Sequence, residues 1–251
     1  MLKIKPELIP AYTISNENQR WATSVVPNVQ SVLTVAGSGD QALFYKLAGA
    51  TIVDTFDITP NARVIQDIKY AAIKNIKQTK YQDLLVALHY AQKILSVPQM
   101  HKLRKYLPKE SRDIVERKTN INIFSCGLPA YVYPENIPTD AEYHKLKEIL
   151  TEPFSFIQTD LAGLSTKISK KYDIINLSNI FDYCYSNKEQ AKILTDLSKH
   201  LNLGGHIVYT PQMPRFDYKR VQMSCGNNIE LAYKKTLKAS DTTLILFQRT
   251  R

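Results

Sequence analysis

The spacing of apolar residues predicts strands and helices in alternation along the chain. Short apolar runs at 31–36, 51–56, 154–158, 172–177 and 206–210 predict strands of a buried parallel sheet, in which both faces of each strand are covered. A helical stretch from Gln41 to Leu47 joins the first two strands, and two runs at 228–233 and 242–248 predict a closing antiparallel pair. The pattern therefore predicts an α/β fold with a mostly parallel sheet.

A long helical pattern separates the second strand from the third. Apolar residues recur there at intervals of three and four, and Pro98 and Pro108 interrupt the pattern. We expect helices at 62–78, 81–96, 99–107 and 110–118. Because an ordinary crossover uses one helix, the region 62–118 is interpreted as a helical insertion within a single domain spanning 1–251. Capping-box patterns at Thr139 and Ser186 predict the starts of two later helices, and Gly204-Gly205 predicts a turn into the strand at 206–210.

Charge is distributed unevenly over this arrangement. The chain has 251 residues, 44% of them hydrophobic, and a net charge of +10. Residues 62–118 hold 13 basic and 5 acidic side chains. The lysines of this basic segment are expected on polar helix faces, where they meet solvent, a nucleic acid or an anionic membrane surface.

Features of membrane and secreted proteins are missing from the pattern. The longest wholly apolar run is Leu84 to Leu88, too short to span a membrane, and the first residues show no apolar segment of a secretion signal. The three cysteines, Cys126, Cys184 and Cys225, lie far apart and form no CxxC pair. We expect a cytoplasmic protein with reduced thiols.

The most specific motif is a glycine loop, Gly37-Ser38-Gly39-Asp40-Gln41-Ala42, which follows a strand and opens a helix. Asp57 lies about 20 residues further on, at the end of the next strand, where an acid binds ribose hydroxyls. This spacing fits a dinucleotide or S-adenosylmethionine, while a plain strand–helix turn is the structural alternative. A carboxylate at Asp40 would repel a pyrophosphate and attract the ammonium and sulfonium of S-adenosylmethionine, so its charge favours the latter.

Two further groups of polar residues follow predicted strands. Asp160 comes after the third strand, at a position suited to the adenine amino group, and Ser178, Asn179 and Asp182 follow the fourth. Open α/β sheets bind ligands at these carboxyl ends. We expect Asn179 to line the pocket and Asp182 to accept a proton, both as catalytic residues, although a turn or helix cap explains such residues equally well. The chain has no phosphate loop, no HExxH and no zinc-spaced cysteines or histidines, so no metal is expected.

Together these motifs resemble the class I S-adenosylmethionine-dependent methyltransferases, whose order of elements includes a glycine pair before the fifth strand and two terminal strands. More narrowly, the chain resembles the S-adenosylmethionine:diacylglycerol 3-amino-3-carboxypropyl transferases of betaine-lipid synthesis. The stretches that carry this resemblance are Asn16-Glu17, Val35 to Asp40, Phe56 to Pro60, Ile68 to Ile73, and Leu177 to Tyr183. The resemblance implies cofactor contacts at Glu17, Gly37, Ser38, Gly39, Asp40, Asp57, Ile58, Asp160, Leu161, Ser178 and Asn179.

The sequence thus predicts a group transferase that uses S-adenosylmethionine. Attack on the methyl carbon gives a methyltransferase, and attack on the γ-carbon gives an aminocarboxypropyl transferase; the cofactor motifs fit both. A small-molecule or lipid acceptor is favoured over a nucleic acid, because the basic segment has tyrosines but neither Phe nor Trp. A nucleic-acid methyltransferase and a protein that binds the cofactor without turnover are the remaining alternatives.

Overall fold

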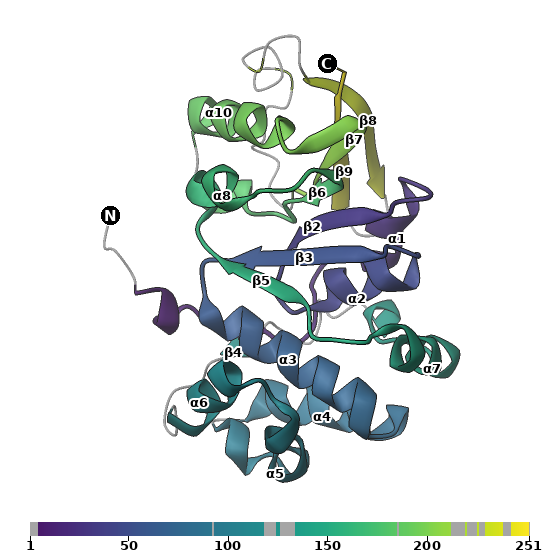
Figure 1. The fold of residues 1–251 in the computed structure, drawn as a ribbon, viewed down its shortest axis with the longest axis vertical. Helices are drawn as coiled ribbons and strands as arrows, with labels where there is room; N and C mark the ends of the chain where they lie inside the picture. Colours follow the sequence, from purple (N-terminus) through teal and green to yellow (C-terminus); the bar gives the residue numbers. More distant parts are fainter. Residues whose placement is uncertain are drawn as a thin grey trace.

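A seven-stranded sheet forms the centre of the molecule, seen in a computed structural model (Figure 1). The structure describes residues 5–91, 93–117, 124–125, 134–184, 186–211, 219, 225, 229–237 and 242–250. The strand order is β5-β3-β2-β6-β7-β9-β8, parallel except that β9 is antiparallel to both its neighbours. The strands are β2 (Ser31–Val35), β3 (Ile52–Asp57), β5 (Ser155–Gln158), β6 (Tyr172–Asn176), β7 (Leu201–Tyr209), β8 (Ile229–Leu237) and β9 (Thr242–Arg249). The predicted α/β sheet and its antiparallel end are confirmed, although residue 228 of the predicted run 228–233 lies outside the described residues.

Helices cover both faces of this sheet. Successive side chains of a strand point to opposite faces, so Val32 packs with α1 and α2 while its neighbour Leu33 packs with α8 and α10. On the first face lie α1 (Gln19–Ser24), α2 (Asp40–Leu47) and α7 (Asp140–Ile149), and on the second lie α8 (Leu161–Lys167), α9 (Phe181–Cys184) and α10 (Asn187–Ser198). Both predicted capping boxes are present at the starts of α7 and α10.

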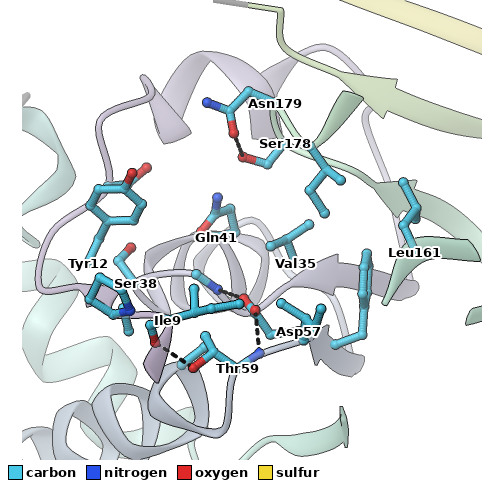
Figure 2. A pocket seen from close by; sticks show the side chains of 18 of the residues that line it. Ile9, Tyr12, Val35, Ser38, Gln41, Asp57, Thr59, Leu161, Ser178 and Asn179 are labelled. Atoms are coloured by element: carbon cyan, nitrogen blue, oxygen red, sulfur yellow. Dashed lines mark hydrogen bonds between the residues drawn. The ribbon is translucent and has the colours of Figure 1, made fainter. Parts of the chain in front are cut away.

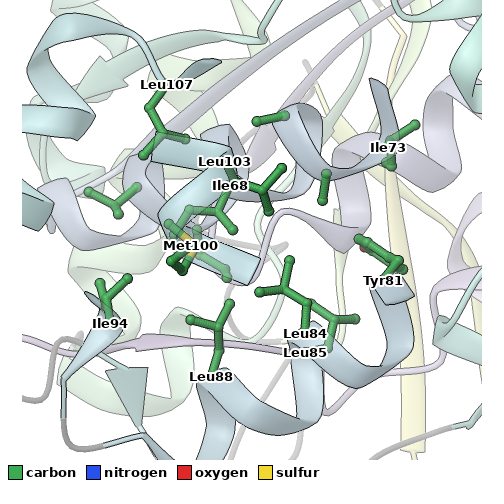
Figure 3. Packing of buried hydrophobic residues seen from close by; sticks show 14 of the residues in the cluster. Ile68, Ile73, Tyr81, Leu84, Leu85, Leu88, Ile94, Met100, Leu103 and Leu107 are labelled. Atoms are coloured by element: carbon green, nitrogen blue, oxygen red, sulfur yellow. The ribbon is translucent and has the colours of Figure 1, made fainter. Parts of the chain in front are cut away.

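The helical insertion packs around one apolar cluster, which also includes residues of α2 and α7. It consists of α3 (Pro60–Asn75), α4 (Gln78–Tyr90), η2 (Ile94–Ser96), α5 (Pro98–Leu103), η3 (Arg104–Tyr106) and α6 (Lys109–Arg117). Figure 3 shows Leu84 and Leu88 of α4 and Met100 of α5 gathered against Ile68 of α3. The predicted helices are present with shifted ends: the second stops at Tyr90, well before the predicted residue 96. Residue 118 lies outside the described residues.

The start of β7 corrects a prediction. The sequence placed Gly204-Gly205 in a turn before a strand beginning at His206, but β7 begins at Leu201 and contains both glycines. The register of β6 and β7 shifts between the pairs Tyr172–Leu201 and Ile174–His206, so the strand is irregular over residues 202–205. Gly204 has a φ of +77°, and at Gly205 an added Cβ would lie 2.9 Å from the carbonyl oxygen of Asn202, so this irregular segment requires glycine at both positions.

The N-terminal chain crosses to the carboxyl-end side of the sheet. After η1 (Pro6–Leu8), the short strand β1 (Ala11–Tyr12) pairs in parallel with β4 (Phe124–Ser125). The Thr59 hydroxyl and the Asn61 amide at the start of α3 donate to the carbonyl of Ile9 at 2.7 and 2.6 Å. These bonds hold the N-terminal chain beside the end of β3. None of the described helices is long and apolar enough to cross a membrane.

Candidate functional site

A cavity of about 460 Å³ lies at the carboxyl ends of the parallel strands (Figure 2). Its walls come from residues 9–12 and 15–16 of the N-terminal chain, 37–38 and 41 after β2, 56–59 at the end of β3, 159–161 after β5 and 178–180 after β6. Small-molecule sites in proteins have volumes of roughly 300–1,000 Å³ and occupy this end of open α/β sheets. The fold therefore places the sequence motifs around one ligand-sized space.

The glycine loop forms the floor of the cavity between β2 and α2. Gly39 caps α2 with a φ of +83°, and an added Cβ would lie 3.0 Å from Cγ and 3.3 Å from Cα of Gln66 on α3. Glycine is required there both for its backbone conformation and for the close contact with the insertion's first helix. Gly37 and Ser38 line the cavity, as the sequence predicted, whereas Gly39 packs behind them against α3.

Asp57 at the end of β3 connects the loop to the next helix. Its carboxylate accepts the N–H of Gly37 at 3.0 Å and the N–H of Thr59 at 3.1 Å. Burial raises the pKa of Asp57, and these backbone hydrogen bonds partly offset the effect. A carboxylate has about four lone-pair sites, so Asp57 retains acceptor capacity toward the cavity that it lines. This arrangement suits a vicinal diol.

One end of the cavity is largely apolar. Ile58 and Leu161 line it together with Val35, and Ile58 is 38% exposed. Asp160 lies at the same end, where it caps α8 by accepting the N–H of Gly163 at 2.7 Å. Asp160 thus both caps a helix and lines the cavity, and its predicted contact with adenine stays a prediction. Apolar side chains beside one acceptor are suited to a purine ring.

The opposite end of the cavity is polar and is formed by Ser178 and Asn179 (Figure 2). Ser178 has a φ of +53°, a conformation that costs energy for a residue with a Cβ and that often accompanies a functional site. Its N–H donates to Asn176 at 2.8 Å, and its carbonyl accepts the N–H of Thr210 at the same distance. Ser178 is therefore held from β6 and from the end of β7.

Glu17 lies behind Ser178 and is buried, with 2% exposure. The Ser178 hydroxyl donates to Oε1 of Glu17, while no described residue forms a hydrogen bond with Oε2. Burial raises the pKa of Glu17 from 4.5 to about 7, with the nearby Asp182 carboxylate adding to the rise. Glu17 is outside the described lining of the cavity, and Ser178 stands between the two.

The position of the Asp40 carboxylate differs from the one predicted from the sequence. Its carboxylate does not face the cavity: it is 1% exposed, forms an ion pair with the buried Lys69 of α3, and accepts the N–H of Ser15 at 2.7 Å. Because Lys69 neutralises it within the fold, its charge gives no reason to prefer one ligand over another. Lys69 itself corrects the expectation that the lysines of the insertion lie on polar helix faces, since it is 1% exposed.

Asp182 on α9 also lies outside the described cavity lining. It accepts the hydroxyl hydrogen of Tyr209, the last residue of β7. A direct role for Asp182 in proton transfer at the cavity stays a prediction, whereas Asn179, the other predicted catalytic residue, lies at the cavity. Among the described residues, no group of three or more His, Cys, Asp or Glu side chains is placed to hold a metal ion.

Most of the N-terminal wall of the cavity was not predicted from the sequence. Tyr12, Ser15 and the neighbouring residues carry no strand or helix periodicity, and Glu17 entered only through a resemblance. This chain is positioned by distant side chains: the Asn136 amide, over a hundred residues away, donates to the carbonyls of Ser15 and Glu17 at 3.1 and 2.6 Å. The cluster of Ser, Asn and Thr at 13–18 was the available signal.

Comparisons with known proteins bear on the fold. No family model and no curated sequence matches the chain. Among solved structures, the rRNA methyltransferase aviRa from Streptomyces viridochromogenes is similar over 98% of this chain and 91% of its own, with 12% identity and a TM-score of 0.51. The N-methyltransferase NodS from Bradyrhizobium japonicum, in complex with S-adenosyl-L-homocysteine, is similar over 92% and 83%, with 11% identity and a TM-score of 0.43.

At such low identity the likeness to aviRa concerns the fold alone. The strand order supports the same conclusion independently, because a parallel sheet with its last strand inserted antiparallel between β7 and β8 is typical of the class I methyltransferase fold. The chain has the fold of the class I S-adenosylmethionine-dependent methyltransferases.

Proposed function

We propose that this protein is an S-adenosylmethionine-dependent methyltransferase. The observation that carries the proposal is the single cavity that joins Gly37, Asp57, Asp160 and Ser178 at the carboxyl ends of the strands. The residues present fit the cofactor: Asp57 would hold the ribose hydroxyls, the apolar end with Asp160 the adenine, and the polar end the amino acid. The cofactor supplies a sulfonium whose methyl carbon is already electrophilic.

The chain's own residues would then orient an acceptor and exclude water. We propose that Asn179 orients the acceptor beside the methyl group, and that the N-terminal chain at 9–16 closes the cavity over it. Asp182 would act through Tyr209, to which it is bonded. Loss of turnover in Asn179→Ala with unchanged cofactor affinity supports a catalytic role. Equal turnover in the variant and the wild type contradicts that role, and absence of turnover in the wild type itself supports a protein that only binds the cofactor.

Ligand binding provides the first test. We expect S-adenosylmethionine and S-adenosylhomocysteine, but not NAD, to raise the melting temperature. Asp57→Asn is expected to weaken S-adenosylhomocysteine binding by about tenfold, the worth of one charge-assisted hydrogen bond. Asp173→Asn is the matched control, because Asp173 accepts two backbone N–H groups of residues 30 and 31 at the opposite end of the sheet. Stabilisation by NAD alone would overturn the proposal.

Aminocarboxypropyl transfer is the second candidate, on the strength of the motifs shared with the betaine-lipid synthesis family. Mass spectrometry of the spent cofactor separates the two reactions. S-adenosylhomocysteine as product supports methyl transfer, and methylthioadenosine supports transfer of the aminocarboxypropyl group. We also propose a cytoplasmic location, in keeping with the free and buried Cys225.

For the acceptor we propose a small molecule or lipid, with the insertion resting on an anionic membrane. Residues 84–109 include five Lys and Arg and no Asp or Glu. Within this stretch Lys102, Arg104 and Lys105 are exposed next to Tyr106, and Val86 and Tyr90 are exposed on α4. Basic side chains interleaved with exposed apolar and aromatic ones favour the surface of an anionic bilayer.

Vesicle sedimentation tests this surface. We expect binding to phosphatidylserine vesicles and not to phosphatidylcholine, weakened about tenfold or more in Lys102→Glu/Lys105→Glu at roughly 1 kcal/mol per charge. Lys192→Glu/Lys199→Glu, with Lys192 on α10 and Lys199 just after it, is the control. Binding to RNA with no binding to anionic vesicles would replace the membrane with a nucleic acid.

A further inference from the structure

Four carboxylate side chains are buried among the described residues, and they differ in how their charge is met. These are Glu17, Asp40, Asp54 and Asp67. Asp40 pairs with Lys69, Asp54 with Lys170 at 3.0 Å, and Asp67 with Arg63 at 3.6 Å. Within the described part of the chain, Glu17 makes no ion pair, and its Oε2 makes no hydrogen bond. A buried carboxylate without a cation is costly, so the exception calls for an explanation.

Among the described residues, the groups around Glu17 add no positive charge. The Ser178 hydroxyl comes from the segment after β6, the carboxylate of Asp182 from α9, and the phenols of Tyr45 and Tyr209 from α2 and β7. Gln19 of α1 lies near enough to favour the charged form of Glu17, and its amide donates to Ser15 at 2.9 Å. Each of these groups is acidic or neutral. The pocket around Glu17 is therefore negative whenever Glu17 is ionised.

The cavity lies next to this pocket. Ser178 lines the cavity with one side and bonds Glu17 with its hydroxyl, and Ser15 and Asn16, just before Glu17 in the chain, line it as well. A cationic group bound at the polar end of the cavity would thus be separated from Glu17 only by the first layer of wall residues. At such short range and low local dielectric, opposite charges attract strongly.

We propose that Glu17 is the counter-charge for a cationic group of the ligand, an ammonium bound at the Ser178 end of the cavity, and that Glu17 releases its proton when that group binds. The inference rests on the proposed function, in which the α-ammonium of S-adenosylmethionine occupies the polar end. No covalent step is involved: the proton on Glu17 passes to solvent, and the ligand's positive charge takes its place. Glu17 here acts on ligand binding and not on the reacting atoms.

Calorimetric titration of the full chain tests this inference, with S-adenosylhomocysteine and methylthioadenosine as probes. Both carry the adenosine that Asp57 would hold, but methylthioadenosine lacks the ammonium. Titrations at pH 6.5 in buffers of different ionisation enthalpy count the protons released. With a pKa of about 7 for the free protein, we expect release of about 0.7 proton with S-adenosylhomocysteine. Methylthioadenosine is expected to release none from Glu17.

Two matched variants test whether the proton released on ligand binding comes from Glu17. Glu17→Gln should abolish the release and make the affinity for S-adenosylhomocysteine independent of pH between 6 and 8, where the wild type gains up to about tenfold. Asp67→Asn is the control. Like Glu17, Asp67 is buried, burial raises its pKa, and it accepts a serine hydroxyl hydrogen, from Ser111 at 2.5 Å. Unlike Glu17, whose partner Ser178 lines the cavity, Asp67 is bonded by a serine outside the cavity lining. This control variant should release protons as the wild type does.

The outcomes separate this inference from the proposed function. Absence of S-adenosylhomocysteine binding to the wild type overturns both. Binding with equal proton release in the wild type and Glu17→Gln, or with equal release for both ligands in the wild type, overturns the role of Glu17 and leaves the proposed function standing. The comparison of the two ligands needs no variant, so it decides the matter even where Glu17→Gln does not fold.

Discussion

Two buried carboxylates on either side of Ser15 show two ways of keeping a charge inside this fold. The N–H of Ser15 donates to Asp40, and its hydroxyl accepts the N–H of Glu17. Both acids are at most 2% exposed. Asp40 is neutralised by Lys69 from the insertion, whereas no described residue places a cation beside Glu17, which accepts the hydroxyl hydrogen of Ser178. The neighbouring sites therefore differ in whether the fold or a ligand supplies the positive charge.

This difference gives the two carboxylates different roles: the Asp40–Lys69 pair stabilises the fold, and Glu17 responds to a ligand. Burial lowers the pKa of Lys69, and the facing carboxylate of Asp40 opposes that shift. The pair is complete without a ligand, so it fixes the glycine loop to α3 permanently. Glu17 is incomplete without one, so its ionisation is free to respond to what enters the cavity. Substitutions at either site test this difference.

The largest effect is expected when the complete pair is broken. Lys69→Met leaves the Asp40 carboxylate buried without a cation, and we expect the free energy of unfolding in urea at pH 7 to fall by about 3–5 kcal/mol. Asp40→Asn/Lys69→Met removes both charges and should recover most of that loss. A loss below about 1 kcal/mol in the single variant would show that the pair does not hold the loop.

Removing the charge of Glu17, which meets no cation among the described residues, should raise the stability of the protein. The pKa of Glu17 in the folded protein, about 7, lies above its ordinary value of 4.5, so the unfolded chain releases the proton first as the pH rises. Stability therefore falls between pH 4.5 and 7, by about 3 kcal/mol at most, and stays lower above pH 7. Glu17→Gln is expected to be more stable than the wild type at pH 8 and equal to it near pH 4.5.

Urea unfolding at the two pH values measures this effect. Asp83→Asn, which alters an exposed acid paired with Lys80, is the control and should change stability by less than about 0.5 kcal/mol at either pH. A Glu17→Gln variant that is less stable than the wild type at pH 8 would mean that its charge is already compensated in the free protein.

The same two sites show how far the sequence alone reaches. The β2–α2–β3 unit, Asp57 and the two capping boxes follow from local spacing, because periodicity and cap chemistry act over a few residues. Lys69 was misplaced on a polar face, because its partner Asp40 lies 29 positions away. Helical spacing identifies a face, but it does not reveal what a distant loop brings to that face.

The N-terminal wall was missed for the same physical reason. Tyr12 and Ser15 have no periodic pattern, and their positions depend on bonds from Thr59, Asn61 and Asn136, which only the folded chain brings together. The start of the fifth strand was placed at residue 206 instead of 201, because the pairing of Leu201 with Tyr172 depends on the neighbouring strand. Tertiary contacts thus determined each feature that the sequence did not.

The smallest effect is expected when the contact between the glycine loop and α3, near the Asp40–Lys69 pair, is disturbed without removing a charge. Gly39→Ala places a methyl group 3.0 Å from Cγ of Gln66, three residues before Lys69 on α3, in a backbone conformation that alanine disfavours. Gly49→Ala is the control: its φ is +105° and nothing lies within 4 Å, so it has the backbone cost, about 1 kcal/mol, without the contact. We expect the free energy of unfolding of Gly39→Ala to fall by about 1 kcal/mol more than that of this control, and its binding of S-adenosylhomocysteine to be weaker.

The number of protons released per ligand bound at pH 6.5 should stay as in the wild type, because Glu17 contacts the cavity wall through Ser178 and not through α3. A changed proton count would mean that the two carboxylates form one coupled site, joined through Ser15.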